Sequence, residues 1–176
     1  MIQLVLGGAR SGKSQYAEQQ ASRTNNDVLY IATATAADSE MSERILQHQQ
    51  QRPTHWTTVE EPRHLAAVLQ QYAKPNRTLL VDCLTLWLSN ILFTTTGETD
   101  EVRFNTEIVS LLKTLPTLTG DIILVSNEVG QGTTPMNVMA RRFIDEAGTL
   151  HQQIADCSDQ VTFVTAGLPQ QLKPTL

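Results

Sequence analysis

The sequence predicts an α/β fold in which a mostly parallel sheet carries helices on both of its faces. Short runs rich in Val, Ile and Leu alternate along the chain with stretches whose apolar residues recur at helical spacing. These runs are continuous rather than alternating, which is typical of strands buried on both faces of a parallel sheet. At 176 residues, the chain is expected to form one domain over residues 1–176.

The elements follow one another from the N-terminus in a regular order. Residues 2–6 predict a first strand, and a helical pattern through Ala17 and Ala21 follows the glycine-rich loop behind it. Residues 28–32 predict a second strand from their continuous apolar run. A helix is predicted over 39–51, where apolar residues return at helical spacing.

The alternation continues to residue 165. Three more apolar runs predict strands at 78–82, 121–126 and 161–165, and the β-branched residues 57–59 are compatible with a short strand. Helices are predicted over 63–72, with Pro62 in the first turn where a missing N–H is tolerated, and over 137–156. The threonine-rich residues 93–99 predict a mobile loop.

Composition excludes several classes of protein. The chain has 13 Lys and Arg against 18 Asp and Glu, a formal charge of −5, which argues against binding to nucleic acid through a basic surface. No apolar run reaches the roughly 18 residues that span a bilayer, and no basic leader precedes the first strand. Cys83 and Cys157 lack metal-ligand spacing. We therefore expect a cytoplasmic protein that does not span a membrane.

The strongest motif follows the first predicted strand and opens the first predicted helix. It matches G-x-x-x-x-G-K-[ST] with Gly7, Gly8, Ala9, Arg10, Ser11, Gly12, Lys13 and Ser14. In such a phosphate-binding loop, backbone N–H groups and the helix N-terminus face the phosphates. Lys13 would reach the β- and γ-phosphates, and the hydroxyl of Ser14 would bind Mg²⁺. The motif predicts a P-loop protein that binds a nucleoside triphosphate.

A second magnesium ligand is expected at the end of another buried strand. Asp82 ends the run at 78–82 and is our candidate, although a carboxylate there also suits the cap of the next helix, and the two roles are compatible. A GTPase switch is disfavoured, because the chain lacks the Asn-Lys-x-Asp motif that reads guanine.

His48 is a candidate nucleophile. In a helix, Arg44, His48 and Arg52 share one face, so that two guanidinium groups flank the imidazole and can hold phosphate oxygens. The arginines also favour the neutral ring, which is the form that attacks phosphorus. A solvated basic helix face explains the same spacing equally well, and geometry alone leaves both interpretations open.

Further motifs form an ordered series along the chain. They are Leu29-Tyr30-Ile31-Ala32-Thr33, Arg52-Pro53-x-His55-Trp56, Asp82-Cys83-Leu84-Thr85 and Asn127-Glu128-Val129-Gly130-x-Gly132-x-x-Pro135. With the P-loop, this series resembles the bifunctional adenosylcobinamide kinase / adenosylcobinamide-phosphate guanylyltransferase family of cobalamin (vitamin B12) assembly. The resemblance extends from Leu4 to about Gly167.

The resemblance implies two reactions. ATP or GTP phosphorylates the aminopropanol hydroxyl of adenosylcobinamide, and GMP is then transferred from GTP onto that phosphate, which gives adenosylcobinamide-GDP and pyrophosphate. The GMP passes through a covalent histidine intermediate, and His48 falls on that position. A RecA-like fold and a homotrimer are implied as well.

The resemblance also assigns nucleotide contacts. They map to the loop from Gly7 to Ser14 and to Ala32, Thr33, Ala34, Gln49, Gln50, Gln51, Arg52, Glu60 and Asp82. Relatives differ from this chain in three places: several have two adjacent histidines where Gln47 precedes His48, some have Glu at Asp82, and Asn often stands at His151.

Two other functions remain open from the residues alone. The first alternative is a kinase that acts on a small metabolite and in which His48 only packs. The second is a RecA-type regulatory module whose output is a conformational change. The first alternative predicts that GTP never labels the protein covalently. The second predicts nucleotide hydrolysis that a partner stimulates. The general base of the kinase step is left open between Glu60 and Asp82.

Overall fold

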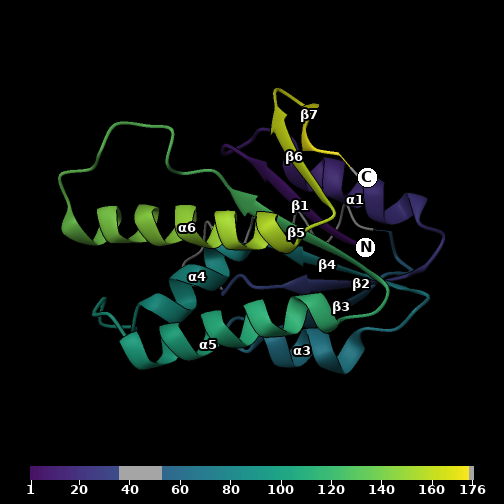
Figure 1. The fold of residues 1–176 in the computed structure, drawn as a ribbon, viewed down its shortest axis with the longest axis horizontal. Helices are drawn as coiled ribbons and strands as arrows, with labels where there is room; N and C mark the ends of the chain where they lie inside the picture. The colour runs from purple at the N-terminus through teal and green to yellow at the C-terminus, as the bar shows by residue number, and fades with distance from the viewer. Residues whose placement is uncertain (36–52, 175–176) are drawn as a thin grey trace.

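The computed structural model describes residues 1–35 and 53–174, and its sheet has seven strands in the order β3-β2-β4-β5-β1-β6-β7 (Figure 1). All neighbouring strands are parallel except the antiparallel pair β6–β7, so the predicted mostly parallel α/β sheet is confirmed. The strands are β1 (Ile2–Gly7), β2 (Asp27–Ala32), β3 (Thr57–Glu60), β4 (Arg77–Asp82), β5 (Asp121–Asn127), β6 (Gln160–Thr165) and β7 (Leu168–Lys173).

Helices cover both faces of the sheet. They are α1 (Lys13–Arg23), α3 (Leu65–Tyr72), α4 (Leu84–Leu92), α5 (Glu101–Thr114) and α6 (Val138–Cys157), with a short 3₁₀ turn η1 (Leu115–Thr117) after α5. Successive residues of β1 belong to opposite cores, because side chains alternate across a strand. Val5 packs with Ala17 of α1, whereas Leu4 belongs to the larger core that contains Trp87 of α4 and Ile154 of α6.

The start of α3 differs from the prediction. The helix begins at Leu65 instead of residue 63. The cause is the Glu61 carboxylate, whose Oε1 accepts the backbone N–H groups of Arg63 at 2.9 Å and His64 at 2.8 Å. Pro62 therefore lies in a turn ahead of the helix rather than in its first turn.

No residue range was predicted from the sequence for helices α4 and α5, the turn η1 or strand β7. Helix α5 buries the polar Glu107 beside Phe104 and Leu111. Glu107 interrupts the apolar face of the helix, so the sequence shows no clear helical spacing of apolar residues there. Strand β7 is almost entirely exposed and has only β6 beside it, so its sequence has no apolar pattern to reveal it. The helix predicted over 39–51 lies outside the described residues.

The loop predicted at 93–99 is a short turn between α4 and α5. Phe93 and Thr99 form an isolated antiparallel bridge, and the N–H of Thr94 donates to the carbonyl oxygen of Glu98 at 2.8 Å. These contacts close the turn and lead the chain to Asp100, whose carboxylate caps α5 by accepting the N–H of Arg103 at 3.0 Å.

The strand order separates the glycine-rich loop from the expected magnesium ligand by one strand. Strand β5 lies between β1, which ends at Gly7, and β4, which ends at Asp82. Gly7 is opposite Asn127, and Asp82 is opposite Val125. The carboxyl ends of these parallel strands meet at one edge of the sheet, which is where open α/β sheets bind ligands.

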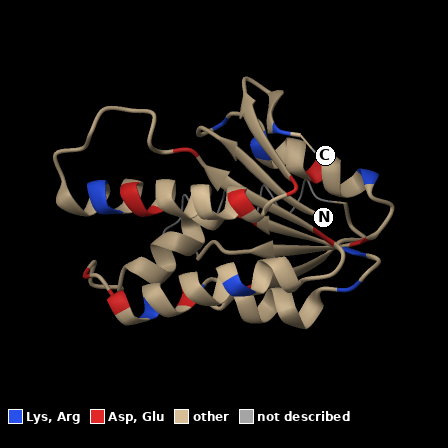
Figure 2. Cartoon of the chain, in the orientation of Figure 1, with Lys and Arg blue, Asp and Glu red and all other residues tan. Residues whose placement is uncertain are grey.

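The outer surface carries charges of both signs. Figure 2 shows acidic and basic residues interspersed on the helices and loops, with the middle of the sheet largely free of them. No helix within the described ranges is long and apolar enough to span a bilayer.

Candidate nucleotide-binding site

The loop at residues 7–14 joins β1 to α1 at the carboxyl edge of the sheet. Gly7 ends β1, and Gly12 precedes α1 with a φ of 92°, in the left-handed region that favours glycine. A Cβ atom at Gly7 would lie 2.5 Å from the carbonyl oxygen of Val164. Because both positions require glycine, the backbone of the loop stays open to close approach by a phosphate.

Lys13 lies against the inside of the loop. Its Nζ donates to the carbonyl oxygen of Gly8 at 3.1 Å, and the backbone N–H of Ser11 donates to the same oxygen at 3.2 Å. Lys13 is the first residue of α1 and is only 8% exposed. The N-terminus of α1 and the ammonium group therefore present positive charge to the same place, which suits an anion.

The remaining side chains of the loop test whether it fits a polyphosphate. The Oγ atom of Ser11 is buried and has no hydrogen-bond partner in the part of the chain that the structure describes. Burying a hydroxyl without a partner costs free energy, and a bound phosphate oxygen that accepts its hydrogen bond would remove this cost. Ala9 and Arg10 are exposed, and Ser14 is half-buried on the first turn of α1. The loop thus has the shape and the donors of a phosphate cradle.

Asp82 is held by a neighbouring strand. The hydroxyl of Tyr30, on β2, donates to Oδ2 of Asp82 at 2.9 Å. Asp82 does not cap α4, since the N-cap residue is Cys83 and no side chain caps that helix. The carboxylate is therefore half-buried at the carboxyl edge with one oxygen fixed by a phenol.

The electrostatics of Cys83 connect Asp82 to the P-loop lysine. Burial raises the pKa of the Cys83 thiol to about 11, and the charge of Asp82 acts in the same direction. The ammonium group of Lys13 acts in the opposite direction on that pKa. Lys13 and Asp82 therefore both lie within electrostatic reach of the Cys83 thiol.

The residues after β2 form the next part of this edge. Ala32 is opposite both Glu60 of β3 and Asp82 of β4. Thr33 is fully buried, and its Oγ1 donates to the carbonyl oxygen of Cys83 at 2.7 Å and accepts the Cys83 N–H at 2.8 Å. These two bonds fix the backbone that leads from Thr33 to the half-buried Ala34.

Glu60 lies away from the P-loop. It is exposed at the end of edge strand β3, and four strand spacings, about 19 Å, separate β3 from β1. Asp82 is two spacings from β1, about 10 Å. Five of the expected site residues, His48, Gln49, Gln50, Gln51 and Arg52, lie outside the described residues.

The structure also brings together a buried polar group to which the sequence analysis assigned no role. His151 of α6 lies beneath the carboxyl edge, with Nε2 at 2.7 Å from Oγ of Ser126. Ser126 Oγ is 3.0 Å from Oγ1 of Thr85, and His151 Nδ1 is 3.7 Å from Oε2 of Glu128. Burial lowers the pKa of His151, while the carboxylate of Glu128 acts against that shift. The Asn-Glu-Val-Gly motif that contains Glu128 was the available sign of this group.

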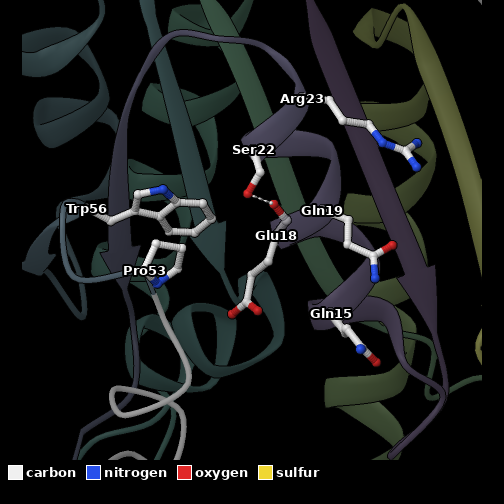
Figure 3. Close-up of a pocket in the computed structure, with 7 residues that line it drawn as sticks. All are labelled: Gln15, Glu18, Gln19, Ser22, Arg23, Pro53 and Trp56. Atoms are coloured by element: carbon white, nitrogen blue, oxygen red, sulfur yellow. Dashed lines mark hydrogen bonds between the residues drawn. The ribbon is translucent and has the colours of Figure 1, made fainter.

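A shallow groove of about 430 Å³ lies elsewhere, beside α1 (Figure 3). It is lined by Gln15, Glu18, Gln19, Ser22, Arg23, Pro53 and Trp56. Trp56 is 8% exposed and belongs to the core under α1, and Trp87 is fully buried. Both tryptophans are therefore core residues.

The donors at the edge fit a magnesium ion that arrives with a nucleotide. Over residues 1–35 and 53–174, no three His, Cys, Asp or Glu side chains form a metal cluster. Mg²⁺ at phosphoryl-transfer sites takes one or two protein oxygens and completes its shell with phosphates and water. Ser14 and Asp82 supply that kind of donor set.

Comparison with known proteins adds independent information. The model of a family described as cobinamide kinase / cobinamide phosphate guanyltransferase matches residues 3–172. The "Bifunctional adenosylcobalamin biosynthesis protein CobP" of Pseudomonas aeruginosa is 53% identical over 173 residues, which cover 98% of each chain. Strong similarity thus extends over almost the whole sequence.

Solved structures resemble the fold at low sequence identity. The flagellar accessory protein FlaH of Methanocaldococcus jannaschii aligns with a TM-score of 0.56 at 11% identity, over 99% of this chain and 78% of that one. The RadB recombinase aligns with a TM-score of 0.50 at 14% identity, over 92% and 73%. These similarities support a RecA-like P-loop fold and nothing further.

Proposed function

This chain belongs to the cobinamide kinase / cobinamide phosphate guanyltransferase family, and from that premise we propose how its residues carry out the two reactions. It is a bifunctional kinase and guanylyltransferase of adenosylcobalamin biosynthesis. We propose that adenosylcobinamide is phosphorylated with ATP or GTP and that its phosphate then receives GMP from GTP. A single domain carries both reactions in this proposal.

The observation that carries the proposal is that Lys13, at the end of the glycine loop, and Asp82, two strands away, lie at the same carboxyl edge of the sheet. In the kinase step, the substrate hydroxyl attacks the γ-phosphorus, and catalysis consists mainly of positioning and charge stabilisation. Lys13 and the N–H groups of the loop would neutralise charge on the β- and γ-phosphate oxygens. Ser14 and Asp82 would hold Mg²⁺, which supplies further positive charge to the phosphates when it is bound.

For guanylyl transfer, we assign His48 as the nucleophile. One imidazole nitrogen forms a bond to the α-phosphorus of GTP, the bond from that phosphorus to the bridging oxygen breaks, and pyrophosphate leaves. An oxygen of adenosylcobinamide phosphate then attacks the phosphoramidate, which releases His48 and gives adenosylcobinamide-GDP. The covalent route divides one displacement into two easier ones. Support comes from Arg44 and Arg52, which flank His48 in the sequence, and from the family.

The nucleotide contacts follow the same edge of the sheet. We assign the phosphates to the loop 7–14 and the rest of the nucleotide to Ala32, Thr33, Ala34, Glu60 and the segment Gln49, Gln50, Gln51 and Arg52. Exposed Glu60 lies far from β1 at the end of an edge strand, so we assign it to the base or ribose rather than to the phosphates. We further propose a cytoplasmic homotrimer; exposed Leu168 and Leu172 on edge strand β7 suit a contact between copies.

Labelling with GTP tests the nucleophile. The protein is mixed with Mg²⁺ and GTP labelled at the α-phosphate, then denatured and examined for label on the chain. An adduct that is labile in acid and stable in base is expected, and it should vanish in His48→Ala. His55→Ala is the matched control, because His55 is exposed and close in sequence, and it should keep the label. Phosphorylation of cobinamide without any adduct would leave only the kinase.

A further inference from the structure

His151 and Glu128 form a polar pair beside the apolar core that α6 covers. Helix α6 packs its apolar side, including Ala147, Leu150 and Ile154, into the larger core. His151 is in the same layer, with a side chain 8% exposed. An imidazole in such a place costs free energy unless both nitrogens have partners.

One nitrogen of this imidazole has no partner. Nε2 bonds to the hydroxyl of Ser126, but Nδ1 has no hydrogen-bond partner among the residues that the structure describes. The polar atom that Nδ1 faces is Oε2 of Glu128, at 3.7 Å. That distance is too long for a hydrogen bond and short enough to become one after a small movement of either side chain. His151 and Glu128 can therefore form one more hydrogen bond, between Nδ1 and Oε2.

Glu128 is fixed next to the first glycine of the P-loop. Its backbone N–H donates to the carbonyl oxygen of Gly7 at 3.0 Å, and its Oε1 accepts the N–H of Gly130 at 2.6 Å. The side chain is 21% exposed, so that the carboxylate remains open to a ligand. A carboxylate has about four acceptor positions, and these contacts leave some of them for a substrate hydroxyl.

Glu60 and Asp82, the two candidate general bases from the sequence, suit proton transfer less well than Glu128. Glu60 lies about 19 Å from β1 across the sheet. Asp82 already accepts a hydrogen bond from Tyr30 and is the residue suited to hold Mg²⁺. A carboxylate bound to a cation loses basicity, because the positive charge favours its ionised form. Glu128, which directly follows the strand between β1 and β4, is free of that second task.

We propose that Glu128 is the general base of the kinase step and that His151 is its positioning residue. As the substrate oxygen bonds to the γ-phosphorus, its proton passes to a carboxylate oxygen of Glu128, and the bond from the γ-phosphorus to the bridging oxygen breaks to release the nucleoside diphosphate. His151 Nδ1, in the tautomer that donates, orients Oε2. The inference rests on the kinase half of the proposed function.

Separate assays of the two half-reactions test the role of Glu128. Phosphorylation of adenosylcobinamide by ATP and GMP transfer to supplied adenosylcobinamide phosphate are measured in wild type, Glu128→Gln, Glu128→Asp and Glu98→Gln. The kinase kcat of Glu128→Gln should fall by about 10²- to 10⁴-fold, with little change in the KM for ATP. Glu128→Asp, which keeps a carboxylate, should retain more. GMP transfer should persist in both, and exposed Glu98→Gln should match wild type throughout.

Two substitutions of His151, one that removes its hydrogen-bond donor and one that replaces it, test the positioning role. His151→Ala should lower the kinase kcat by about tenfold, because Ala has no Nδ1 to move the short distance needed to donate a hydrogen bond to the charged Oε2 of Glu128. His151→Asn places an amide donor at the same position and should restore most of that loss. Rescue by Asn together with an unchanged KM for ATP distinguishes orientation of Glu128 from general support of the fold.

Three results would overturn the inference. The first is a kinase kcat in Glu128→Gln within threefold of wild type. The second is an equal loss of both half-reactions in Glu128→Gln, which would assign Glu128 to the shape of the P-loop. The third is a wild-type enzyme that transfers GMP and never phosphorylates cobinamide, which would remove the kinase step itself. The wild-type assay therefore separates failure of the proposed function from failure of this inference.

Discussion

The hydroxyl of Tyr30 donates a hydrogen bond of 2.9 Å to Oδ2 of Asp82, between adjacent strands at the carboxyl edge. Strand β2 therefore fixes the direction of a carboxylate that belongs to β4. A carboxylate whose orientation is fixed in advance binds a cation with less loss of side-chain entropy.

Tyr30→Phe should weaken this arrangement without breaking the fold, because the ring remains to fill the buried site. A hydrogen bond to a charged group contributes about 1.5–3 kcal/mol, part of which is recovered by water at this edge. We expect the Mg²⁺ concentration for half-maximal kinase activity to rise by about three- to tenfold. Titration of activity with Mg²⁺ measures this. Tyr72→Phe, on α3, is the control, and an equal shift in that variant would contradict the role of Tyr30.

Lys13→Ala should impair both half-reactions, because both start from the same bound triphosphate. Loss of one charged donor to transition-state oxygens typically costs about 10²- to 10³-fold in kcat. The measurement is kcat for phosphorylation and for GMP transfer, together with the unfolding temperature to verify the fold. Retention of either activity within threefold of wild type would show that the P-loop lysine does not serve that reaction.

The stability of the protein should decrease with acidification in a way that depends on His151. Burial lowers the pKa of His151 from its ordinary 6.5, and Glu128 is the charged group that faces the ring. The unfolded chain therefore binds the proton more readily, so this contribution to stability is complete above pH 6.5 and is lost as the pH falls toward the folded pKa.

Urea unfolding between pH 7.5 and 5 measures this effect. The free energy of unfolding of wild type should decrease more steeply across that range than that of His151→Asn, which has no group to protonate. His55→Asn, at an exposed position, should follow wild type. Parallel pH dependences in wild type and His151→Asn would contradict the assignment.

Cys83 should be unreactive in the folded protein. Burial, followed by the charge of Asp82, raises the pKa of its thiol to about 11, so only about one thiol in a thousand is ionised at pH 8. Cys157→Ser leaves Cys83 as the sole cysteine of the sequence. With Ellman's reagent at pH 8, that variant should show no rapid reaction when folded and one thiol per chain in denaturant. Fast reaction of the folded variant would show that Cys83 is accessible.

The sequence was sufficient for the buried parallel strands β1, β2, β4, β5 and β6 and for α1 and α6, since apolar runs and helical spacing persist wherever an element is buried on its core side. It was insufficient for β7, because an exposed edge strand such as Leu168–Lys173 needs no apolar pattern. The exact start of α3 also escaped prediction, because the carboxylate of Glu61 satisfies the N–H groups of Arg63 and His64 ahead of the helix.

Some residues of the candidate site could likewise be predicted from the sequence and others could not. The P-loop could be predicted because its glycines and lysine are consecutive in the sequence, and Asp82 because it ends a strongly apolar strand. The pair of Glu128 and His151 could not, since these residues are on different elements and only the packing of α6 under β5 brings them together.

Strand β1 lies between β5 and β6, whose residues come more than a hundred positions later in the chain. A nascent chain on the ribosome therefore makes β2, β3 and β4 before the glycine loop has any strand to support it. Long-range pairing of this kind forms late in folding. A message truncated before β6 would yield a chain in which one edge of β1 has no partner strand and is open to aggregation.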